Sequence, residues 1–385
     1  MAYAYKEDFY DAFQCAGSEC PYTCCNCTWK IEVDKKTDAY YQSLDGTFGA
    51  WVNERIDRSR DIAYMKMHTN GLCSVLTEEG LCGIQLELGE MALCDTCRSF
   101  PRRTIRSSAA NAAFISMSPA CPVVSRELLT RRKPIRLIEG EMYSDRELPS
   151  SAFLRTAFFR SFAVLQDRNR DIAQRQKLFL LLNQALQEVH TAQDEKKGEL
   201  LLAFFEKPDN YRAMVPPNKE ESFQLAGKLR LLRDICPIVL EVNPFLESFM
   251  LMTRALEYLR TLEGSEREEE EIRTWFRRLD SGRHEAAQEN MLVNALLRYY
   301  HCGDFFADDF FRKAGFIVLL NQFLRIFAAV GSASAGKLLD IDERSLYSCY
   351  LSRGFEHNKS CRERISETLL QNQLLELPFL FQIIS

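Results

Sequence analysis

The stretch CAGSECPYTCCNCTW, from Cys15 to Trp29, places five cysteines within thirteen positions of a chain of 385 residues. Crowded cysteines form disulfides in exported proteins, whereas inside the cell they bind metals or take part in catalysis. The N-terminal sequence MAYAYKEDFYDAF lacks the basic, apolar and small-residue regions of a secretory signal. We therefore expect a cytoplasmic protein with reduced thiols, in which this stretch holds a metal.

The distribution of cysteines predicts two domains. Ten of the fourteen cysteines lie between Cys15 and Cys121, so residues 1–150 are expected to form an irregular, cysteine-rich metal-binding domain. Residues 151–385 show helical spacing of apolar side chains and are expected to form an all-helical domain, with a sub-boundary near 206–221. The expected fold is therefore mainly α, with helices around 178–189 and over 245–264, 266–280, 284–301, 310–330, 342–352 and 358–375.

The cysteines of the first domain have the short spacings of metal ligands. The pattern C-x4-C-x3-C-C begins at Cys15 and is followed by Cys27, two single cysteines, a C-x2-C pair and a last cysteine before Pro122. Four thiolates hold either a zinc ion or an iron–sulfur cluster, so the metal and the number of sites stay open. The four later cysteines are expected to pack as small buried apolar residues: Cys236, Cys302, Cys349 and Cys361.

Charge and hydropathy exclude two classes of partner. The net charge of −5 does not suggest a nucleic-acid-binding protein. The longest apolar run, AGFIVLLNQFLRIFAAV, contains Asn321, Gln322 and Arg325, so we expect no transmembrane segment and leave only peripheral membrane association open. Locally, the segment from Arg98 to Arg136 holds nine basic residues and one acidic residue, which makes it a candidate anion-binding stretch.

The cysteine pattern resembles that of the bacterial flagellin lysine-N-methylases. Three segments carry the resemblance: FQCAGSECPYTCCNCTWKIEVDKKTDAYY, GLCSVLTEEGLCGIQLELGEMALCDTCRSFPRR and SMSPACPVV. The matching residues besides cysteine are Trp29, Asp34, Tyr40, Leu88, Gly89, Pro101 and Arg102. The matching cysteines are Cys15, Cys20, Cys24, Cys25, Cys73, Cys82, Cys97 and Cys121, and Cys27 and Cys94 rank lower as ligands.

This resemblance implies methyl transfer from S-adenosylmethionine to the side-chain amines of lysines in flagellin. It also implies a 4Fe-4S cluster held by these cysteines, with zinc as the alternative metal. The chain has no glycine-rich loop between a strand and a helix, so the methyl donor must bind in another way. Because arginine pairs with carboxylates, the candidate donor-binding residues are Arg98, Arg102 and Arg103.

Methyl transfer requires a base, because the lysine side chain is protonated at neutral pH and must lose a proton before its nitrogen can accept a methyl group. Asp34 belongs to the matched pattern and is one candidate. The segment QENMLVNALLRYY resembles a family stretch that reads roughly E-H-x-L-x-N-Y-L, which adds Glu289 and Asn294 as candidate catalytic residues.

Two other functions stay open. The first alternative is a non-catalytic zinc- or iron-binding module. The second is a radical S-adenosylmethionine enzyme that acts on another substrate. The spacing Cys20-x3-Cys24-x2-Cys27 is that of the radical enzymes, although the helical second half does not suggest their alternating strands and helices. The phosphate-loop-like GSASAGKL has Leu338 in place of a magnesium-binding hydroxyl, so we expect it to end a helix.

Overall fold

The second half of the chain is helical, as predicted. The computed structural model describes residues 2–26, 30–142, 152–216, 225–242, 247–262, 266–279, 283–303, 306–307, 309–356 and 359–384. Its C-terminal helices are α6 (Ala152–Leu165), α7 (Ile172–Ala192), α8 (Glu195–Phe204), α9 (Leu225–Val242), α10 (Glu247–Leu262), α11 (Glu266–Leu279), α12 (Arg283–Tyr299), α13 (Phe310–Ala335), α14 (Ile341–Glu356), α15 (Lys359–Gln371) and α16 (Leu377–Ile384). The prediction of a mainly α protein is confirmed.

The first half contains sheets, so the prediction of an irregular N-terminal domain is wrong on this point. A four-stranded sheet has the order β5-β6-β1-β7, formed by β1 (Ala2–Glu7), β5 (Arg102–Ser107), β6 (Ala112–Met117) and β7 (Leu137–Met142). β1 runs parallel to β6 and antiparallel to β7. Because β1 pairs with strands more than a hundred residues away, the short local pattern AYAYKE does not reveal its partners.

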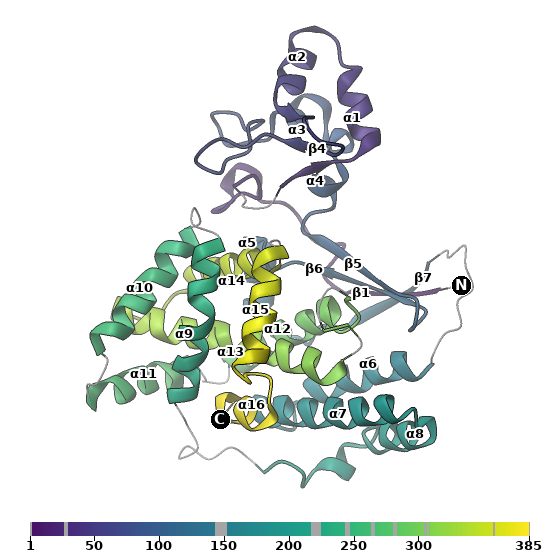
Figure 1. The fold of residues 1–385 in the computed structure, drawn as a ribbon, viewed down its shortest axis with the longest axis vertical. Coiled ribbons are helices and arrows are strands. Elements are labelled where there is room, and N and C mark those ends of the chain that lie inside the picture. The colour runs from purple at the N-terminus through teal and green to yellow at the C-terminus, as the bar shows by residue number, and fades with distance from the viewer. Residues whose placement is uncertain are drawn as a thin grey trace.

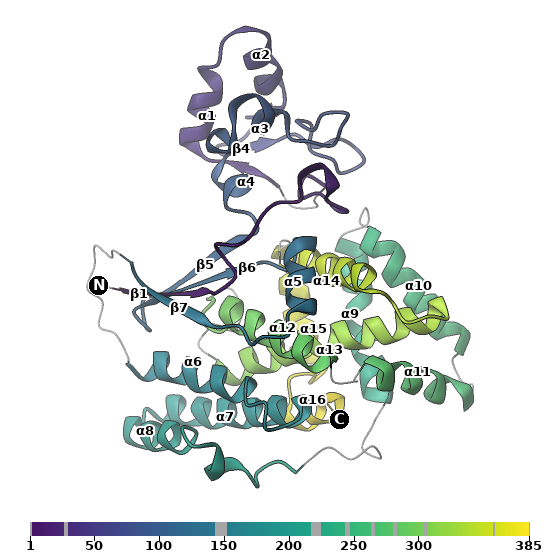
Figure 2. The same ribbon diagram turned by 180° about the vertical axis from the view of Figure 1, so that it is seen from behind.

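The cysteine-rich segment forms a small body with its own core. Four short helices, α1 (Lys35–Gln42), α2 (Gly46–Glu54), α3 (Gly83–Leu88) and α4 (Asp95–Ser99), surround a sheet of order β2-β4-β3, with β2 (Glu32–Val33), β3 (Ile56–Asp57) and β4 (Ala63–Met65). Ile31, Val52 and Ile84 are buried in its centre together with several cysteines. This body stands at one end of the molecule, and the four-stranded sheet lies between it and helices α6, α7 and α8 (Figures 1 and 2).

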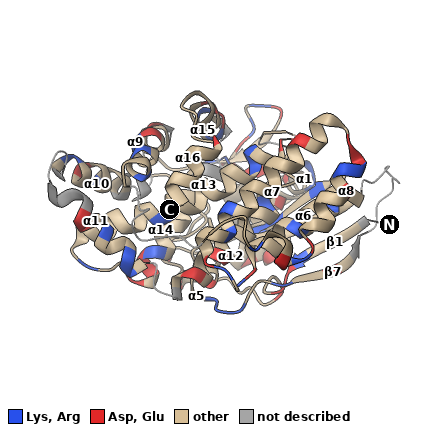
Figure 3. Ribbon diagram, turned by 90° about the horizontal axis from the view of Figure 1, so that it is seen from below, with Lys and Arg blue, Asp and Glu red and all other residues tan. Residues whose placement is uncertain are grey.

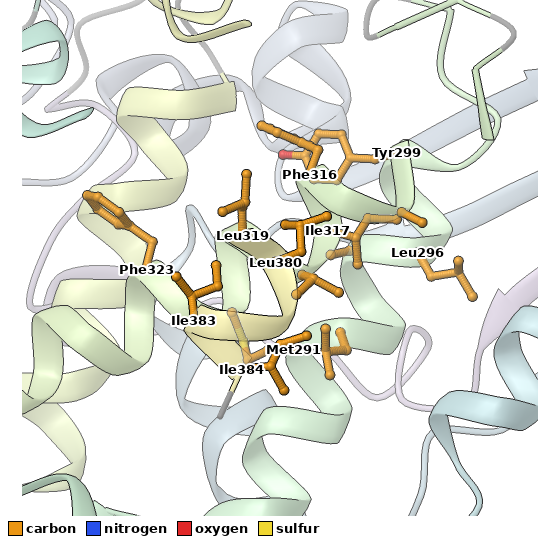
Figure 4. Close-up of a cluster of buried hydrophobic side chains, with 14 of the residues drawn as sticks. Met291, Leu296, Tyr299, Phe316, Ile317, Leu319, Phe323, Leu380, Ile383 and Ile384 are labelled. Carbon is orange, nitrogen blue, oxygen red and sulfur yellow. The ribbon is translucent and has the colours of Figure 1, made fainter. Parts of the chain in front are cut away.

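The larger core is centred on α12 and α13. Leu296, Ile317 and Leu380 are fully buried in it and come from three different helices (Figure 4). Tyr5 and Phe114 of the four-stranded sheet belong to the same core, which therefore takes residues from both sides of residue 150. Helix α5 (Pro122–Thr130) follows Cys121 and packs against α12 and α14.

Helix α13 contains the apolar run singled out in the sequence. Within the described ranges it is the one helix long and apolar enough to cross a membrane, and 78% of its most apolar window is buried against other parts of the protein. It continues through the segment GSASA and ends at Gly336, which has a left-handed conformation. The helix predicted over 310–330 thus runs on to Ala335, and GSASAGKL ends it at Gly336, where the expected turn of small residues is instead helical. On the face seen from below, basic and acidic residues are interspersed over the helices (Figure 3).

Candidate functional site

Five predicted metal ligands lie together in the core of the small body. We call them the core cysteines: Cys25, Cys73, Cys82, Cys94 and Cys97. The amide of Cys73 donates to the carbonyl oxygen of Cys25 at 2.8 Å, which places these two segments side by side. Cys82 and Cys94 directly precede α3 and α4, so each lies at a helix N-terminus. The fold thus gathers thiols from four separate stretches of the chain.

Two pairs of neighbouring cysteines favour the thiolate form of one partner. A hydrogen bond from Cys25 lowers the pKa of Cys24, and the positive charge of Arg353 acts in the same direction. A hydrogen bond from Cys97 likewise lowers the pKa of Cys94. Burial instead raises the pKa of Cys73 to about 11. Because the thiolate is the form that binds metals, the two pairs have the chemistry of soft-metal ligands.

The core cysteines suit a metal because they offer sulfur donor atoms and because these thiols lie near one another. Within the described residues, no three His, Cys, Asp or Glu side chains already converge as a ligand set. The thiols nevertheless interact, because the hydrogen bond to Cys94 raises the pKa of Cys97, and the charges of Cys82 and Cys94 add to the effect of burial in raising the pKa of Cys73. An all-thiolate site therefore needs reorientation of side chains that are already neighbours. Cys27 and Trp29 lie outside the described residues.

A second group of cysteines lies where the small body meets the helices. We call them the junction cysteines: Cys20, Cys24, Cys121 and Cys349. Cys349 is buried in α14, as expected, and its Sγ lies 2.9 Å from the carbonyl oxygen of Ala120. Its place beside the predicted ligands was not foreseen, because it follows Ala120 by 229 residues and no spacing pattern includes it. Cys15 is exposed at the start of the same loop.

Arg353 of α14 clamps the loop that carries Cys20 and Cys24. Its buried guanidinium donates to the carbonyl oxygens of Tyr22 at 3.0 Å, Thr23 at 3.1 Å and Asn26 at 2.7 Å. It also donates to the carbonyl oxygen of Ala120, at 2.9 Å, directly before Cys121. One side chain of α14 therefore fixes both N-terminal segments that supply junction cysteines, and α14 itself supplies the fourth, Cys349.

The three arginines predicted to bind the methyl donor contact different parts of the protein. Arg98 pairs with Asp95. Arg102 packs over the aromatic rings of Tyr10 and Phe13, and Arg103 donates to the Sγ of Cys302 at 3.6 Å. The structure does not bring the three guanidinium groups together around one ligand.

Asp34 caps a helix and joins it to another. Its carboxylate accepts hydrogen bonds from the amide of Thr37 at 3.0 Å and from the amide of Asp95 at 2.9 Å. Partial burial alone would raise the pKa of Asp34, but these two donors outweigh it and lower the pKa below its ordinary value. The carboxylate thus connects the start of α1 with α4, close to Cys94 and Cys97.

Glu289 lies in a buried ion-pair network. Arg168 donates to both of its carboxylate oxygens at 2.8 Å, and Arg175 donates to one of them at 2.6 Å. Glu289 and Arg175 are almost completely buried, whereas Arg168 is partly exposed. Two guanidinium groups share this one carboxyl group through charge-assisted hydrogen bonds, and they link α12 to α7 and to the segment before it.

Asn294 contacts a buried carboxyl group that the sequence analysis did not identify. Its side-chain amide donates to Glu7 at 2.8 Å and to the carbonyl oxygen of Met117 at 2.8 Å. Glu7 is fully buried, and burial raises its pKa to about 7 despite the hydrogen bonds that it accepts from Asn294 and, at 2.8 Å, from the amide of Met117. Asn294 and Arg298 also line a cavity of about 30 Å³. Glu7 lies on the same face of β1 as the buried Tyr5, because alternate residues of a strand point to the same side, and this alternation is the signal in the sequence for its burial.

Comparison with known proteins identifies the family. The family described as the FliB lysine N-methylase C-terminal domain matches residues 160–383. The flagellar biosynthetic protein FliU of Salmonella muenchen is 33% identical over 156 residues, which cover 38% of this chain and 89% of that protein. The lysine-N-methylases of Salmonella typhimurium and Salmonella choleraesuis are each 34% identical over 139 residues, which cover 34% of this chain.

The alignments with the two lysine-N-methylases span 33% of the length of each, about a third. No solved structure matches this chain significantly. The family match covers more than half of the chain, namely helices α7 to α16 and part of α6. This chain belongs to the FliB lysine N-methylase family.

Proposed function

We propose that this protein transfers the methyl group of S-adenosylmethionine to the side-chain amines of lysines in flagellin, in the cytoplasm before flagellin is exported. The observation that carries the proposal is the family match over residues 160–383. The names of the relatives, lysine-N-methylase and flagellar biosynthetic protein, support an enzyme that modifies lysine in a flagellar protein.

The reaction is a displacement at carbon. The lysine ammonium, with an ordinary pKa near 10.4, first loses a proton to a base or to water. The neutral nitrogen then attacks the methyl carbon, so that an N–C bond forms while the S–C bond breaks and its electron pair returns to sulfur. The products are a methylated lysine and S-adenosylhomocysteine. Because a neutral amine is a sufficient nucleophile, no radical is required.

We further propose that the ligands of a 4Fe-4S cluster come from the core cysteines and from Cys20, Cys24 and Cys121 of the junction, with zinc as the alternative metal. Thiolates from several segments are the donors that such clusters and tetrahedral zinc both use. When bound, the cluster would cross-link the segments from Cys24 to Cys97 and place negative charge near Arg353. The clamp by Arg353 would keep this centre in contact with α14.

Anaerobic purification followed by iron, sulfide and zinc analysis tests the metal. We expect iron and sulfide in near-equal amounts, and a colourless zinc-loaded protein would contradict the cluster. The cytoplasmic location is tested by fractionating host cells.

Mass spectrometry of host flagellin tests the substrate. Lysine methylation is expected in strains that carry the gene and not in strains without it, and identical methylation in both would contradict flagellin as substrate. A metal-binding module would bind no S-adenosylmethionine, whereas a radical enzyme would release a deoxyadenosyl product.

A further inference from the structure

A groove of about 440 Å³ opens between α10, the C-terminal part of α13, and α14. Its walls include Met250 and Ala255 of α10, together with Leu339, Leu346 and two tyrosines. Its volume is within the range of sites for small molecules, whereas cavities of about 30 and 70 Å³ elsewhere in the helical part are too small for a nucleoside.

A glycine shapes the floor of this groove. A Cβ atom at Gly331 would lie 2.9 Å from the Oη atom of Tyr347 and 3.2 Å from the Cδ1 atom of Leu339. Such distances are too short for an ordinary side chain, so glycine allows the phenol ring of Tyr347 to cross closely over α13. The residue that resembled part of a phosphate loop in the sequence therefore makes room for an aromatic wall.

The groove has charges of both signs beside its apolar walls. Arg254 is an exposed residue of α10. Glu343 lies in the first turn of α14, where it pairs with Lys337 at 2.9 Å and accepts a hydrogen bond from the amide of Asp340. Both charges act on Tyr347, so they are close to the aromatic wall. This arrangement complements a ligand with a flat apolar ring and a zwitterionic end.

One end of the groove adjoins the junction cysteines. Tyr350 lines the groove, and its ring meets the ring of Tyr22 edge-on with the centres 4.6 Å apart. Tyr22 belongs to the loop between Cys20 and Cys24 and is held by Arg353. The wall of the groove at Tyr350 is therefore in direct contact with the loop that carries Cys20 and Cys24.

We propose that this groove, formed around Arg254, Gly331, Tyr347 and Tyr350, is the binding site for S-adenosylmethionine. The proposal rests on the methyl transfer proposed above and locates its donor. The tyrosines and leucines would cover the adenine, and Arg254 would pair with the carboxylate of the methionine part. Glu343 supplies negative charge toward the ammonium and sulfonium groups. The site also explains how a chain without a glycine-rich nucleotide loop binds this donor.

Isothermal titration calorimetry with two ligands tests the site. S-adenosylmethionine has the carboxylate and ammonium, whereas 5′-methylthioadenosine lacks them. In Arg254→Gln we expect about tenfold weaker binding of S-adenosylmethionine and unchanged binding of 5′-methylthioadenosine. The control is Arg260→Gln, an exposed arginine of the same helix that does not line the groove, and it should bind both ligands as the unmodified protein does.

A second variant, Gly331→Ala, places a methyl group against Tyr347 and is expected to weaken both ligands. Its folding is checked by circular dichroism and thermal unfolding, and Arg254→Gln keeps the test decisive if Gly331→Ala does not fold. Unchanged donor binding in Arg254→Gln, with weakened binding in Arg102→Gln, would overturn the groove in favour of the basic stretch. If the unmodified protein binds no S-adenosylmethionine at all, the proposed methyl transfer itself fails.

Discussion

The guanidinium carbon of Arg353 lies 3.8 Å from the centre of the Tyr22 ring, and the same group donates a hydrogen bond to the carbonyl oxygen of Tyr22. These residues are 331 positions apart in the chain. The contact combines a cation–π interaction with charge-assisted hydrogen bonds in a place without solvent, where both are strongest. It attaches the cysteine loop to the helical part at one point.

Replacement of Arg353 by lysine should loosen this attachment. An ammonium has no planar fork with which to reach four carbonyl oxygens, so buried acceptors would lose their donors. We expect Arg353→Lys to lower the free energy of unfolding by about 3 kcal/mol, and to speed alkylation of Cys20 and Cys24. The control Arg364→Lys alters an exposed ion pair with Glu241 and should change stability by less than about 1 kcal/mol. Equal alkylation rates in both variants would contradict the clamp.

Cysteine variants separate ligands from packing residues. Cys24→Ser and Cys97→Ser are expected to lose metal after anaerobic purification, because a hydroxyl is a poor replacement for a thiolate. Cys236→Ser should keep its metal, since Cys236 is buried in the larger core. Cys349→Ser should also keep it, because the hydroxyl can replace the thiol that donates to Ala120. The same metal content in all four variants would refute the ligand assignment.

The buried network around Glu289 predicts a structural role. Glu289→Gln leaves Arg168 and Arg175 without their shared carboxylate and should lower the free energy of unfolding by about 3 kcal/mol. Glu285→Gln is the control, because Glu285 lies on the same helix, is 38% exposed and pairs with Arg175 at 3.5 Å. Chemical denaturation measures the free energy of unfolding of both variants. A variant Glu289→Gln with unchanged stability and no methyl transfer would instead indicate a catalytic base.

Glu7 predicts a pH dependence of stability. Its folded-state pKa of about 7 is above the ordinary value of 4.5, so the folded state holds a proton that the unfolded state releases between these values. The contribution of this protonated group to the free energy of unfolding is fully present below pH 4.5 and is lost as the pH rises through about 7. The whole loss is roughly 3 kcal/mol. Chemical denaturation at pH 5 and pH 8 measures this loss, and we expect Glu7→Gln not to show it. The exposed Glu139→Gln of the same sheet should retain it.

The helices could be predicted because their signals are local. Apolar spacing and end signals indicate helices near 266–280 and 284–301, close to α11 and α12, since both depend on residues only a few positions apart. The match to the lysine-N-methylase family likewise follows from the order of residues. The thiols that gather in the small body were also recognisable, because short spacings between cysteines are typical of metal ligands.

The partners of single polar residues depended on the tertiary structure. Glu7 ends an unremarkable strand, and only its pairing beside β6 buries it against Asn294. Arg353 and Gly331 look like ordinary residues of long helices, and their roles arise from contacts with Tyr22 and Tyr347. A sequence specifies local backbone preference through neighbouring residues, whereas burial and hydrogen-bond partners are set by segments that meet only when the whole chain packs.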